Sequence, residues 1–369
     1  MISAEDFCAL LKSHGFGAFT GVPCSYLSGL VELLDVTGRY LPAPNEGAAL
    51  AIAAGAALAG DQMGVLIQNS GLGNLINPLT SLVMPYRIGV AVFMSLRGWP
   101  DPARDEPQHA VMGSTSHALL DALGVWHWTL DGELSSLETI LQQAADRVAA
   151  GVPAFVLVPK GTVQKGAAPE GTGRAVPAAF GRAEALRTLA KTVPVSAAVV
   201  STTGYTSREL CAVADRPSHF YMQGSMGHAS AIGLGFALRS PHRPVVVLDG
   251  DGAALMHLGT LSAIGYVAPR NLVHVVLDDG VYASTGAQPT TSATTDFARL
   301  ARAAGYRTAV ACADSPSLAR ALNNALDTPG PHCVWARIDA GGSTPPRVTD
   351  AIGPAELRKR FSQWAGERA

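Results

Sequence analysis

Short apolar runs alternate with stretches of helical periodicity along the whole chain. The runs that predict buried strands cover residues 18–20, 63–68, 89–95, 154–158, 197–201, 245–249, 272–276 and 332–338. Helical patterns lie between them, at residues 3–14, 48–59, 182–191 and 253–264, and again from Pro354 onward. This alternation of strand and helix favours an α/β fold built on parallel sheets flanked by helices.

A stretch rich in Gly, Pro and polar residues divides the pattern into two halves. Residues 160–177 show neither helical nor strand periodicity, which is typical of a linker. We therefore expect a first domain over residues 1–165, a linker over 166–177 and a second domain over 178–369. Each half repeats the strand–helix alternation, so each predicts its own parallel sheet.

Composition narrows the classes of function. Charged residues make up 15% of the chain, against about 25% in typical domains, which suggests that part of the surface lies in subunit contacts. The net charge of −2 argues against nucleic-acid binding. The five cysteines have no CxxC spacing, so we expect neither zinc nor a disulfide framework. No signal peptide and no apolar stretch of about 18 residues is apparent, so we expect no membrane span and a cytoplasmic location.

Two neighbouring apolar runs of the second half end in acidic turns, Gly250-Asp251-Gly252 and Leu277-Asp278-Asp279-Gly280. Ligands of open α/β sheets bind at the carboxyl ends of the strands, so Asp251 and Asp279 are expected to face one site. Two carboxylates there suit a hard cation that also carries phosphate oxygens. The pair therefore predicts a magnesium-diphosphate site.

Two further loops suit an anion. Ser201-Thr202-Thr203-Gly204 follows a strand and opens a helix, so its hydroxyls and free N–H groups can meet phosphate. In Gly224-Ser225-Met226-Gly227-His228, missing Cβ atoms let the backbone approach a ligand. Each loop alone is weak, because most Gly-rich turns are only turns. Together with the acidic turns they indicate phosphate binding.

This set of motifs resembles the thiamine-diphosphate enzymes, and most closely their short two-domain members, which decarboxylate phosphonopyruvate or sulfopyruvate. Matching motifs run through nearly the whole chain. Besides the four loops above they are Asn45-Glu46-Gly47, Asn69-Ser70-Gly71-Leu72-Gly73-Asn74, Asn77-Pro78-Leu79-Thr80-Ser81, Asp105-Glu106-Pro107-Gln108-His109, Tyr205-Thr206-Ser207-Arg208-Glu209 and Ser284-Thr285-Gly286.

The resemblance implies thiamine diphosphate and Mg²⁺ as cofactors. It implies Asp251, Asp279 and the backbone carbonyl of Val281 as metal ligands. The residues it implies for the cofactor are Glu46, Asn74, Ser201, Thr202, Thr203, Gly224, Ser225, Met226, Gly250, Asp251, Gly252, Ala253, Asp279, Val281 and Tyr282. Sites of this family form between the first domain of one subunit and the second domain of another, so self-association is also expected.

Asp279 departs from the family, which usually has Leu-Asp-Asn where this chain has Leu277-Asp278-Asp279. An aspartate still ligates magnesium but adds a negative charge beside the diphosphate. We expect a tighter metal dependence, or a weaker cofactor affinity, than an asparagine would give. A lower cofactor affinity in Asp279→Asn would refute this expectation.

Glu46 is the expected catalytic residue. Its apolar flanks at residues 41–44 and 48–59 favour a poorly solvated, neutral carboxyl. By the resemblance, such a carboxyl hydrogen-bonds N1′ of the cofactor's aminopyrimidine and favours the tautomer that removes the thiazolium C2 proton. A glutamate at a helix start after Asn45 would equally suit the helix dipole. Met226 is the bulky residue implied beneath the cofactor, although a core methionine would look the same.

The implied reaction is loss of CO₂ from a 2-oxo acid with an anionic tail, releasing an aldehyde. Ser25 resembles a position that touches the substrate carboxylate, but a serine capping the next helix fits equally. Arg97 and His109 are candidates for binding the anionic tail, and His109 also for proton donation, although such residues are more often salt-bridged or structural. The remaining substrate candidates are Gln68, Ser284 and Thr285.

Several alternatives stay open. Sulfopyruvate is the alternative substrate. Because sulfopyruvate decarboxylases are often split into two subunits, one continuous chain favours phosphonopyruvate. The product would then be phosphonoacetaldehyde, formed in phosphonate biosynthesis. A carboligase is less expected in so short a chain. A dinucleotide oxidoreductase is disfavoured because Gly71-Leu72-Gly73-Asn74 has no third glycine and the next strand ends at Arg97. No P-loop is present, and a noncatalytic binding protein remains possible because one fold hosts many functions.

Overall fold

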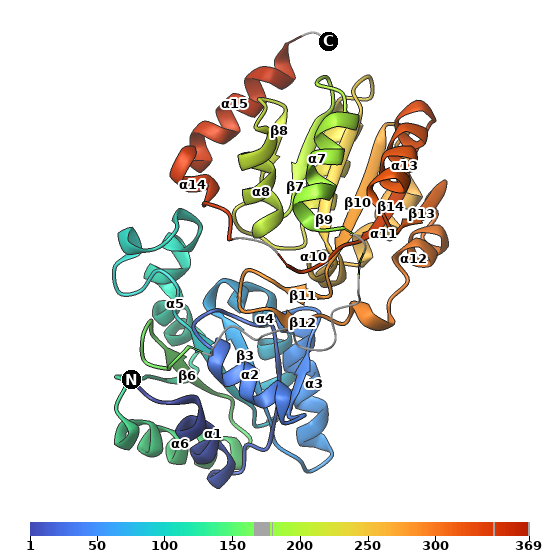
Figure 1. The fold of residues 1–369 in the computed structure, drawn as a ribbon. Coiled ribbons are helices and arrows are strands. Elements are labelled where there is room, and N and C mark those ends of the chain that lie inside the picture. The colour runs from blue at the N-terminus through green and yellow to red at the C-terminus, as the bar shows by residue number, and fades with distance from the viewer. Residues whose placement is uncertain (166–177, 179, 342–343, 368–369) are drawn as a thin grey trace. The chain divides into compact units, whose positions relative to one another are not determined.

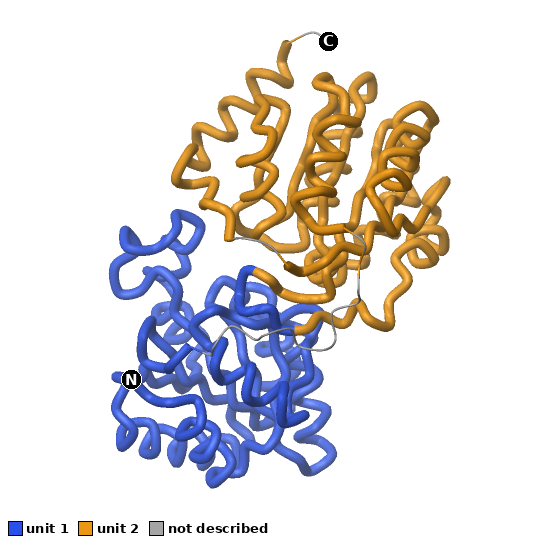
Figure 2. Tube along the Cα trace, in the orientation of Figure 1, with its two compact units in different colours: residues 1–170, 284–288 blue, residues 171–283, 289–369 orange. Residues whose placement is uncertain are grey.

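The computed structural model describes residues 1–165, 178, 180–341 and 344–367 (Figure 1). The chain divides into two compact units. Unit 1 comprises Met1–Glu170 and Ser284–Gln288, and unit 2 comprises Gly171–Ala283 and Pro289–Ala369 (Figure 2). The linker expected at 166–177 lies outside the described residues.

Unit 1 contains a six-stranded sheet in the order β2-β1-β3-β4-β6-β5, and its paired strands are parallel. The strands are β1 (Ala18–Gly21), β2 (Tyr40–Pro42), β3 (Met63–Gln68), β4 (Ala91–Ser95), β5 (Trp126–Thr129) and β6 (Ala154–Val158). The helices are α1 (Ala4–Ser13), α2 (Ser28–Val36), α3 (Glu46–Leu58), α4 (Leu72–Pro78), α5 (Ala110–Ala122) and α6 (Leu134–Ala149).

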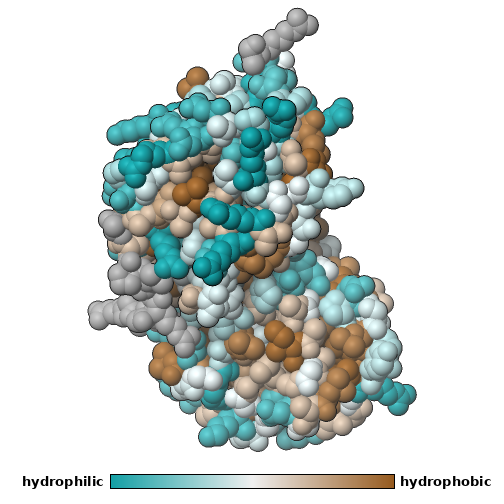
Figure 3. All heavy atoms as spheres, turned by 90° about the vertical axis from the view of Figure 1, so that its right-hand side faces the viewer, coloured by the Kyte–Doolittle hydropathy of each residue, from teal (hydrophilic) through white to brown (hydrophobic). Residues whose placement is uncertain are grey.

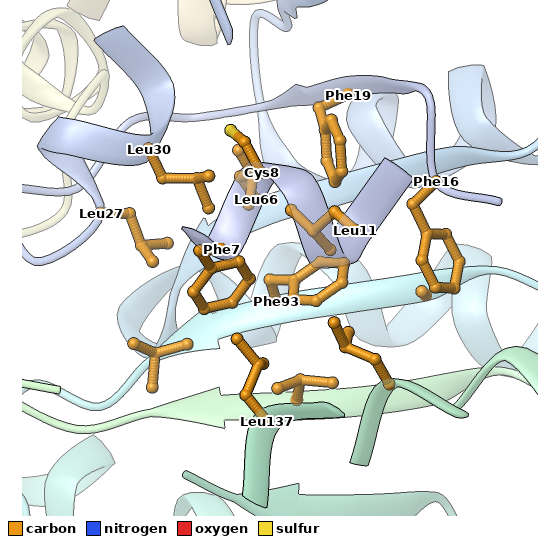
Figure 4. Packing of buried hydrophobic residues seen from close by; sticks show 14 of the residues in the cluster. Phe7, Cys8, Leu11, Phe16, Phe19, Leu27, Leu30, Leu66, Phe93 and Leu137 are labelled. Atoms are coloured by element: carbon orange, nitrogen blue, oxygen red, sulfur yellow. The ribbon is translucent and has the colours of Figure 1, made fainter. Parts of the chain in front are cut away.

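Alternate residues of these strands serve two hydrophobic clusters. In β4, Phe93 belongs to a cluster with α1, α2 and α6, whereas Val92 and Met94 belong to one with α3, α4 and α5. Figure 4 shows the first cluster, in which Phe93 packs edge-on against Phe7 and Phe19 at centroid distances of 6.1 and 5.9 Å. A strand covered on both faces is expected to be a nearly continuous apolar run, which is the pattern of β4 up to Ser95.

Unit 2 contains a second parallel six-stranded sheet, in the order β13-β14-β10-β9-β7-β8. Its strands are β7 (Ala198–Ser201), β8 (His219–Tyr221), β9 (Val245–Gly250), β10 (Leu272–Asp278), β13 (Thr308–Cys312) and β14 (His332–Arg337), and two short strands, β11 (Val281–Tyr282) and β12 (Gln288–Pro289), follow β10 along the chain. Helices α7 (Arg182–Thr192), α8 (Tyr205–Ala214) and α13 (Ser315–Asp327) pack in one cluster, and α9 (Ala229–Arg239), α11 (Gly259–Val267) and α12 (Phe297–Ala303) in another. Helices α10 (Asp251–Met256), α14 (Val348–Ala351) and α15 (Pro354–Gly366) complete the unit.

The predicted α/β class with parallel sheets flanked by helices is confirmed, but two helix boundaries differ. The helix expected at 253–264 is broken, because His257 has φ −133° and ψ 50° and ends α10 before α11 begins. Helix α3 begins at Glu46 rather than residue 48, since the Asn45 side chain caps it by accepting from the Ala48 amide at 2.9 Å. Within the described residues, no helix combines the length and apolar character needed to cross a membrane.

Candidate active site

The carboxyl ends of four neighbouring strands in unit 2 carry the predicted phosphate and metal residues. The register pairs Leu277 of β10 with Gly250 of β9, and Ser201 of β7 with both Leu248 and Tyr221. The turns that follow these strands therefore lie along one edge of the sheet, with the two acidic turns as neighbours. This is the edge at which open α/β sheets bind ligands.

Asp251 and Asp279 are both withdrawn from water at this edge. Asp251 is 2% exposed and accepts a hydrogen bond from the Thr290 hydroxyl. Burial, followed by the charges of Asp279 and Asp278, raises the pKa of Asp251 well above its usual range. Burial likewise raises the pKa of Asp279 to about 6, against the opposing effects of the Val281 amide and Arg182.

The donor set fits a divalent cation. Asp278 is also buried and accepts from the indole N–H of Trp335 at 2.9 Å, so three carboxylates gather where water solvates them poorly. Buried carboxylates of like charge are costly unless a cation offsets them, and oxygen ligands are those that Mg²⁺ prefers. Among the described residues no group of three or more His, Cys, Asp or Glu side chains is arranged so that it could hold a metal ion by itself. The carbonyl oxygen of Val281, expected from the sequence as the third ligand, stays a prediction.

The loop after β7 offers a hydroxyl for an anion. Thr202 is 2% exposed, and its Oγ1 has no hydrogen-bond partner among the described residues. The Ser201 hydroxyl instead pairs with that of Ser207 at 2.6 Å, and Thr203 is half-buried. A buried hydroxyl without a partner is unfavourable, so Thr202 fits a diphosphate oxygen better than Ser201 does.

The turn after β8 contains two residues with left-handed backbone. Ser225 and Gly227 have φ of 56° and 88°, and such left-handed residues turn successive N–H groups toward one side. Gly224 and Met226 are half-buried in the same turn. The structure therefore brings the turn of residues 224–228 to the same sheet edge as the acidic turns.

Gly252 makes room for an aromatic ring. A Cβ on Gly252 would lie 2.5 Å from Cε1 of Tyr282, so the ring packs directly on the backbone of the acidic turn. Gly250 is half-buried, whereas Ala253 and Val281 are buried. Close packing of this kind holds the turns after β9 and β10 together.

In unit 1, Glu46 is 5% exposed at the start of α3. Asn74 Nδ2 of α4 donates to Glu46 Oε2 at 2.9 Å. A Cβ on Gly71 would lie only 2.1 Å from Glu46 Oε1, so the absence of a side chain there provides the space for this carboxyl. Glu46 and Asn74, each expected separately as a cofactor residue, are thus in contact.

Arg97 is engaged in an ion pair. Its Nε donates to Asp105 Oδ2 at 2.7 Å and its Nη2 to Oδ1 at 2.5 Å, with both side chains largely buried. Asp105 also accepts from the Gly98 amide at 2.9 Å, and the Tyr26 ring lies 4.9 Å from the guanidinium carbon. The charge of Arg97 is therefore already balanced within unit 1, where it orders the loop that leads to buried His109.

The other substrate candidates lie in two places. Ser25 is half-buried after β1, and Gln68 ends the adjacent β3, where it accepts from the Cys24 thiol at 3.3 Å and donates to Ser70 Oγ at 2.6 Å. Ser284 is exposed, and Thr285 Oγ1 donates to the side-chain oxygen of Gln288 at 2.9 Å. Of these candidates, Gln68 ends β3, the neighbour of β4, which leads to Arg97, whereas Ser25 follows β1 on the other side of β3.

Four residues make contacts at the candidate site that the sequence analysis did not predict: Arg182, Thr290, Asp105 and Gly71. Asp105 and Gly71 lay inside motifs quoted for the family, but nothing local assigned them a partner. The sequence position of Arg182 was informative, because the dipole of α7 disfavours a cation at the first residue of the helix, so a nearby anion is expected.

Comparison with known proteins bears on the whole chain. Residues 1–123 match the N-terminal TPP binding domain of thiamine pyrophosphate enzymes, and residues 202–336 match the C-terminal TPP binding domain. A phosphonopyruvate decarboxylase of Streptomyces viridochromogenes is 44% identical over 98% of this chain and 94% of its own. One of Streptomyces hygroscopicus is 42% identical over 100% of this chain and 95% of its own.

A sulfopyruvate decarboxylase of Methanosarcina acetivorans is more distant, at 29% identity over 97% of this chain and 96% of its own. That relative also aligns over almost the full length. The continuity of this chain therefore does not separate the two activities, contrary to the sequence-based argument above.

Proposed function

Because this chain belongs to the phosphonopyruvate decarboxylase family of thiamine pyrophosphate enzymes, we propose that its substrate is phosphonopyruvate and its products are phosphonoacetaldehyde and CO₂. Membership makes it a thiamine-diphosphate-dependent 2-oxo acid carboxy-lyase. The observation that carries the choice of substrate is the identity of 44% and 42% to two phosphonopyruvate decarboxylases over nearly full length, against 29% to the sulfopyruvate enzyme. A role in phosphonate biosynthesis is part of the proposal.

Mg²⁺ is the proposed metal, held by Asp251, Asp279 and the carbonyl oxygen of Val281. The buried carboxylates and their raised pKa values support this assignment, because an unbalanced acidic cluster gains most from a bound dication. The unpartnered hydroxyl of Thr202 supports a diphosphate beside the metal.

Bound thiamine diphosphate would supply the electron sink that lets CO₂ leave the oxo acid. Glu46 is the residue proposed to hold a proton for the aminopyrimidine. Its Oε2 already accepts from Asn74, so Oε1, which lies against Gly71, is the oxygen we assign to the proton. Burial and the Asn74 contact would keep this carboxyl in one orientation.

For the phosphonate tail, we retain Arg97, His109, Ser284 and Thr285 as candidates, and Ser25 and Gln68 for the oxo-acid end. The bidentate pair with Asp105 makes Arg97 the least available of these, since binding substrate would require it to share its donors. His109 follows in the same loop and is buried. We therefore favour an organising role for Arg97 and propose His109 as the proton donor.

We also propose self-association, with each cofactor held by the first domain of one copy and the second domain of another, and a cytoplasmic location. Exposed apolar side chains support self-association. Leu58, Tyr86 and Val111 of unit 1 are 74%, 72% and 70% exposed. In the view of Figure 3, hydrophobic residues gather on the visible face of unit 1. Sedimentation of the purified chain with and without cofactor tests this part.

Phosphorus NMR of phosphonopyruvate incubated with the protein, thiamine diphosphate and Mg²⁺ tests the function. We expect a phosphonoacetaldehyde signal that requires both cofactors, with CO₂ released in equal amount. Sulfopyruvate and pyruvate, followed by CO₂ release, are the matched substrates. Turnover of sulfopyruvate alone would support decarboxylation of a 2-oxo acid but reject phosphonopyruvate as the substrate. No turnover of any of the three compounds would reject the proposed substrate class.

A further inference from the structure

Arg182 occupies an unusual place for a cation. It is the first residue of α7, where the helix dipole disfavours positive charge, and it is 4% exposed. A buried guanidinium at a helix N-terminus is stable only if anions offset it. The structure supplies those anions from two other segments of unit 2.

Glu209 and Asp279 are the anions. Arg182 Nε donates to Glu209 Oε2 at 2.7 Å, and Arg182 Nη1 lies 3.5 Å from Asp279 Oδ2. The Glu209 and Asp279 side chains are only 13% and 10% exposed. The Tyr205 ring lies 5.1 Å from the guanidinium carbon and covers a third side. Arg182 is thus held in place from several directions.

We infer that Arg182 is the counter-charge that allows a third carboxylate, that of Asp279, to stand beside those of Asp251 and Asp278. Arg182 binds Glu209 with one donor and reaches Asp279 with another, so it offsets the additional charge without taking a metal-ligating role itself. It is therefore a positioning residue for the diphosphate site. The inference rests on the proposed Mg²⁺-diphosphate site.

The chemistry of arginine suits this role. Its planar guanidinium presents several donors in fixed directions, and it stays charged in a buried setting. A lysine at residue 182 would keep the charge but offers one nitrogen for two carboxylates. A second arginine is available for comparison, because one small cavity of unit 2 is lined by Asp278, Asp279, Gly280, Ser292, Ala293 and Arg337. Arg337 is exposed, and its guanidinium lies over Trp335 at 4.6 Å.

The test is a double-mutant cycle on the full chain with Arg182→Met, Asp279→Asn and both together. Two quantities are measured: the urea midpoint of unfolding without cofactor, and the dissociation constant of thiamine diphosphate at saturating Mg²⁺, from tryptophan fluorescence. We expect Arg182→Met alone to weaken cofactor binding about tenfold and to lower the midpoint, because the acidic cluster loses its cation. With asparagine at position 279, the same change should weaken binding less than about threefold.

Arg337→Met is the matched control, since it removes a positive charge from a cavity lined by Asp278 and Asp279 without touching the Arg182 contacts. We expect it to change cofactor affinity less than about twofold. Equal losses for Arg182→Met in both backgrounds would overturn the inference, as would an equal loss in Arg337→Met. If Arg182→Met does not fold, Arg182→Gln, which also removes the charge, replaces it in both backgrounds and is judged by the same criterion.

The two proposals fail separately. If the wild-type chain binds no thiamine diphosphate, the proposed function is wrong, but the unfolding midpoints without cofactor still report the coupling of Arg182 to Asp279. If cofactor binds and the coupling is absent, only the role of Arg182 is wrong.

Discussion

Gly71→Ala tests the placement of Glu46 by adding one methyl group. The backbone of Gly71, with φ −83° and ψ −5°, accepts alanine without strain. The added Cβ would, however, lie 2.1, 2.3 and 2.4 Å from Oε1, Cδ and Cγ of Glu46. Since ordinary contacts begin at 3.4 Å, the carboxyl would have to retreat by about 1 Å or more.

The size of the effect follows from that displacement. Moving a catalytic group by about 1 Å costs about 100-fold in rate, equivalent to about 2.7 kcal/mol in the activation free energy. The overpacked contact should also cost about 1–3 kcal/mol of stability. We expect Gly71→Ala to lower kcat for phosphonopyruvate about 100-fold, while the affinity for thiamine diphosphate falls much less, because the residues proposed to hold the diphosphate lie in unit 2.

Steady-state CO₂ release at saturating Mg²⁺ and thiamine diphosphate measures kcat, and fluorescence titration measures cofactor affinity. Gly73→Ala is the matched control in the same motif, because a Cβ there meets nothing within 4 Å. It should leave kcat unchanged and stability equal or higher by up to about 1 kcal/mol. The reasoning is refuted if Gly71→Ala keeps kcat within about twofold of wild type, or if Gly73→Ala loses as much.

The remaining predictions concern charge. Asp251→Asn should weaken thiamine diphosphate binding at fixed Mg²⁺ at least about 100-fold, yet leave the cofactor-free protein equally or more stable, because a poorly solvated carboxylate is removed. Burial lowers the pKa of His219 to about 4. Between pH about 6.5 and 4 the unfolded chain therefore binds a proton that the folded chain does not, and stability should fall over this range by up to about 3 kcal/mol, a loss that His219→Gln abolishes. Arg97→Met and Asp105→Asn should each destabilise unit 1 by about 2–4 kcal/mol, with little further loss in the double variant.

Each of these has a measurement that can contradict it. A cofactor-free Asp251→Asn protein with a clearly lower urea midpoint would mean that the carboxylate stabilises the fold. An unchanged pH slope in His219→Gln would assign the acid loss elsewhere, and His242→Gln, at an exposed position, is its control. If Arg97→Met raised KM for phosphonopyruvate while Asp105→Asn did not, Arg97 would bind the substrate tail rather than order its loop.

Local patterns carried the prediction of the fold. The strand expected at 63–68 coincides with β3, and that at 154–158 with β6, because strands covered on both faces are apolar along most of their length. Short-range chemistry also located the turns, since glycine and aspartate after an apolar run are recognisable without knowing the neighbouring strands. The break at His257 was missed because the apolar pattern continues across it.

The sequence alone was enough to identify two parallel-sheet units, the sheet edge with the acidic turns, and the family. These features could be predicted because periodicity and turn chemistry depend on residues that are close together in the chain. The contacts that tune the site needed the folded structure. Arg182 meets Asp279 across 97 positions, and Asn74 meets Glu46 across 28. Such pairs depend on which strands and helices become neighbours, and the order β10-β9-β7 differs from the order along the chain, so no local pattern could have revealed them.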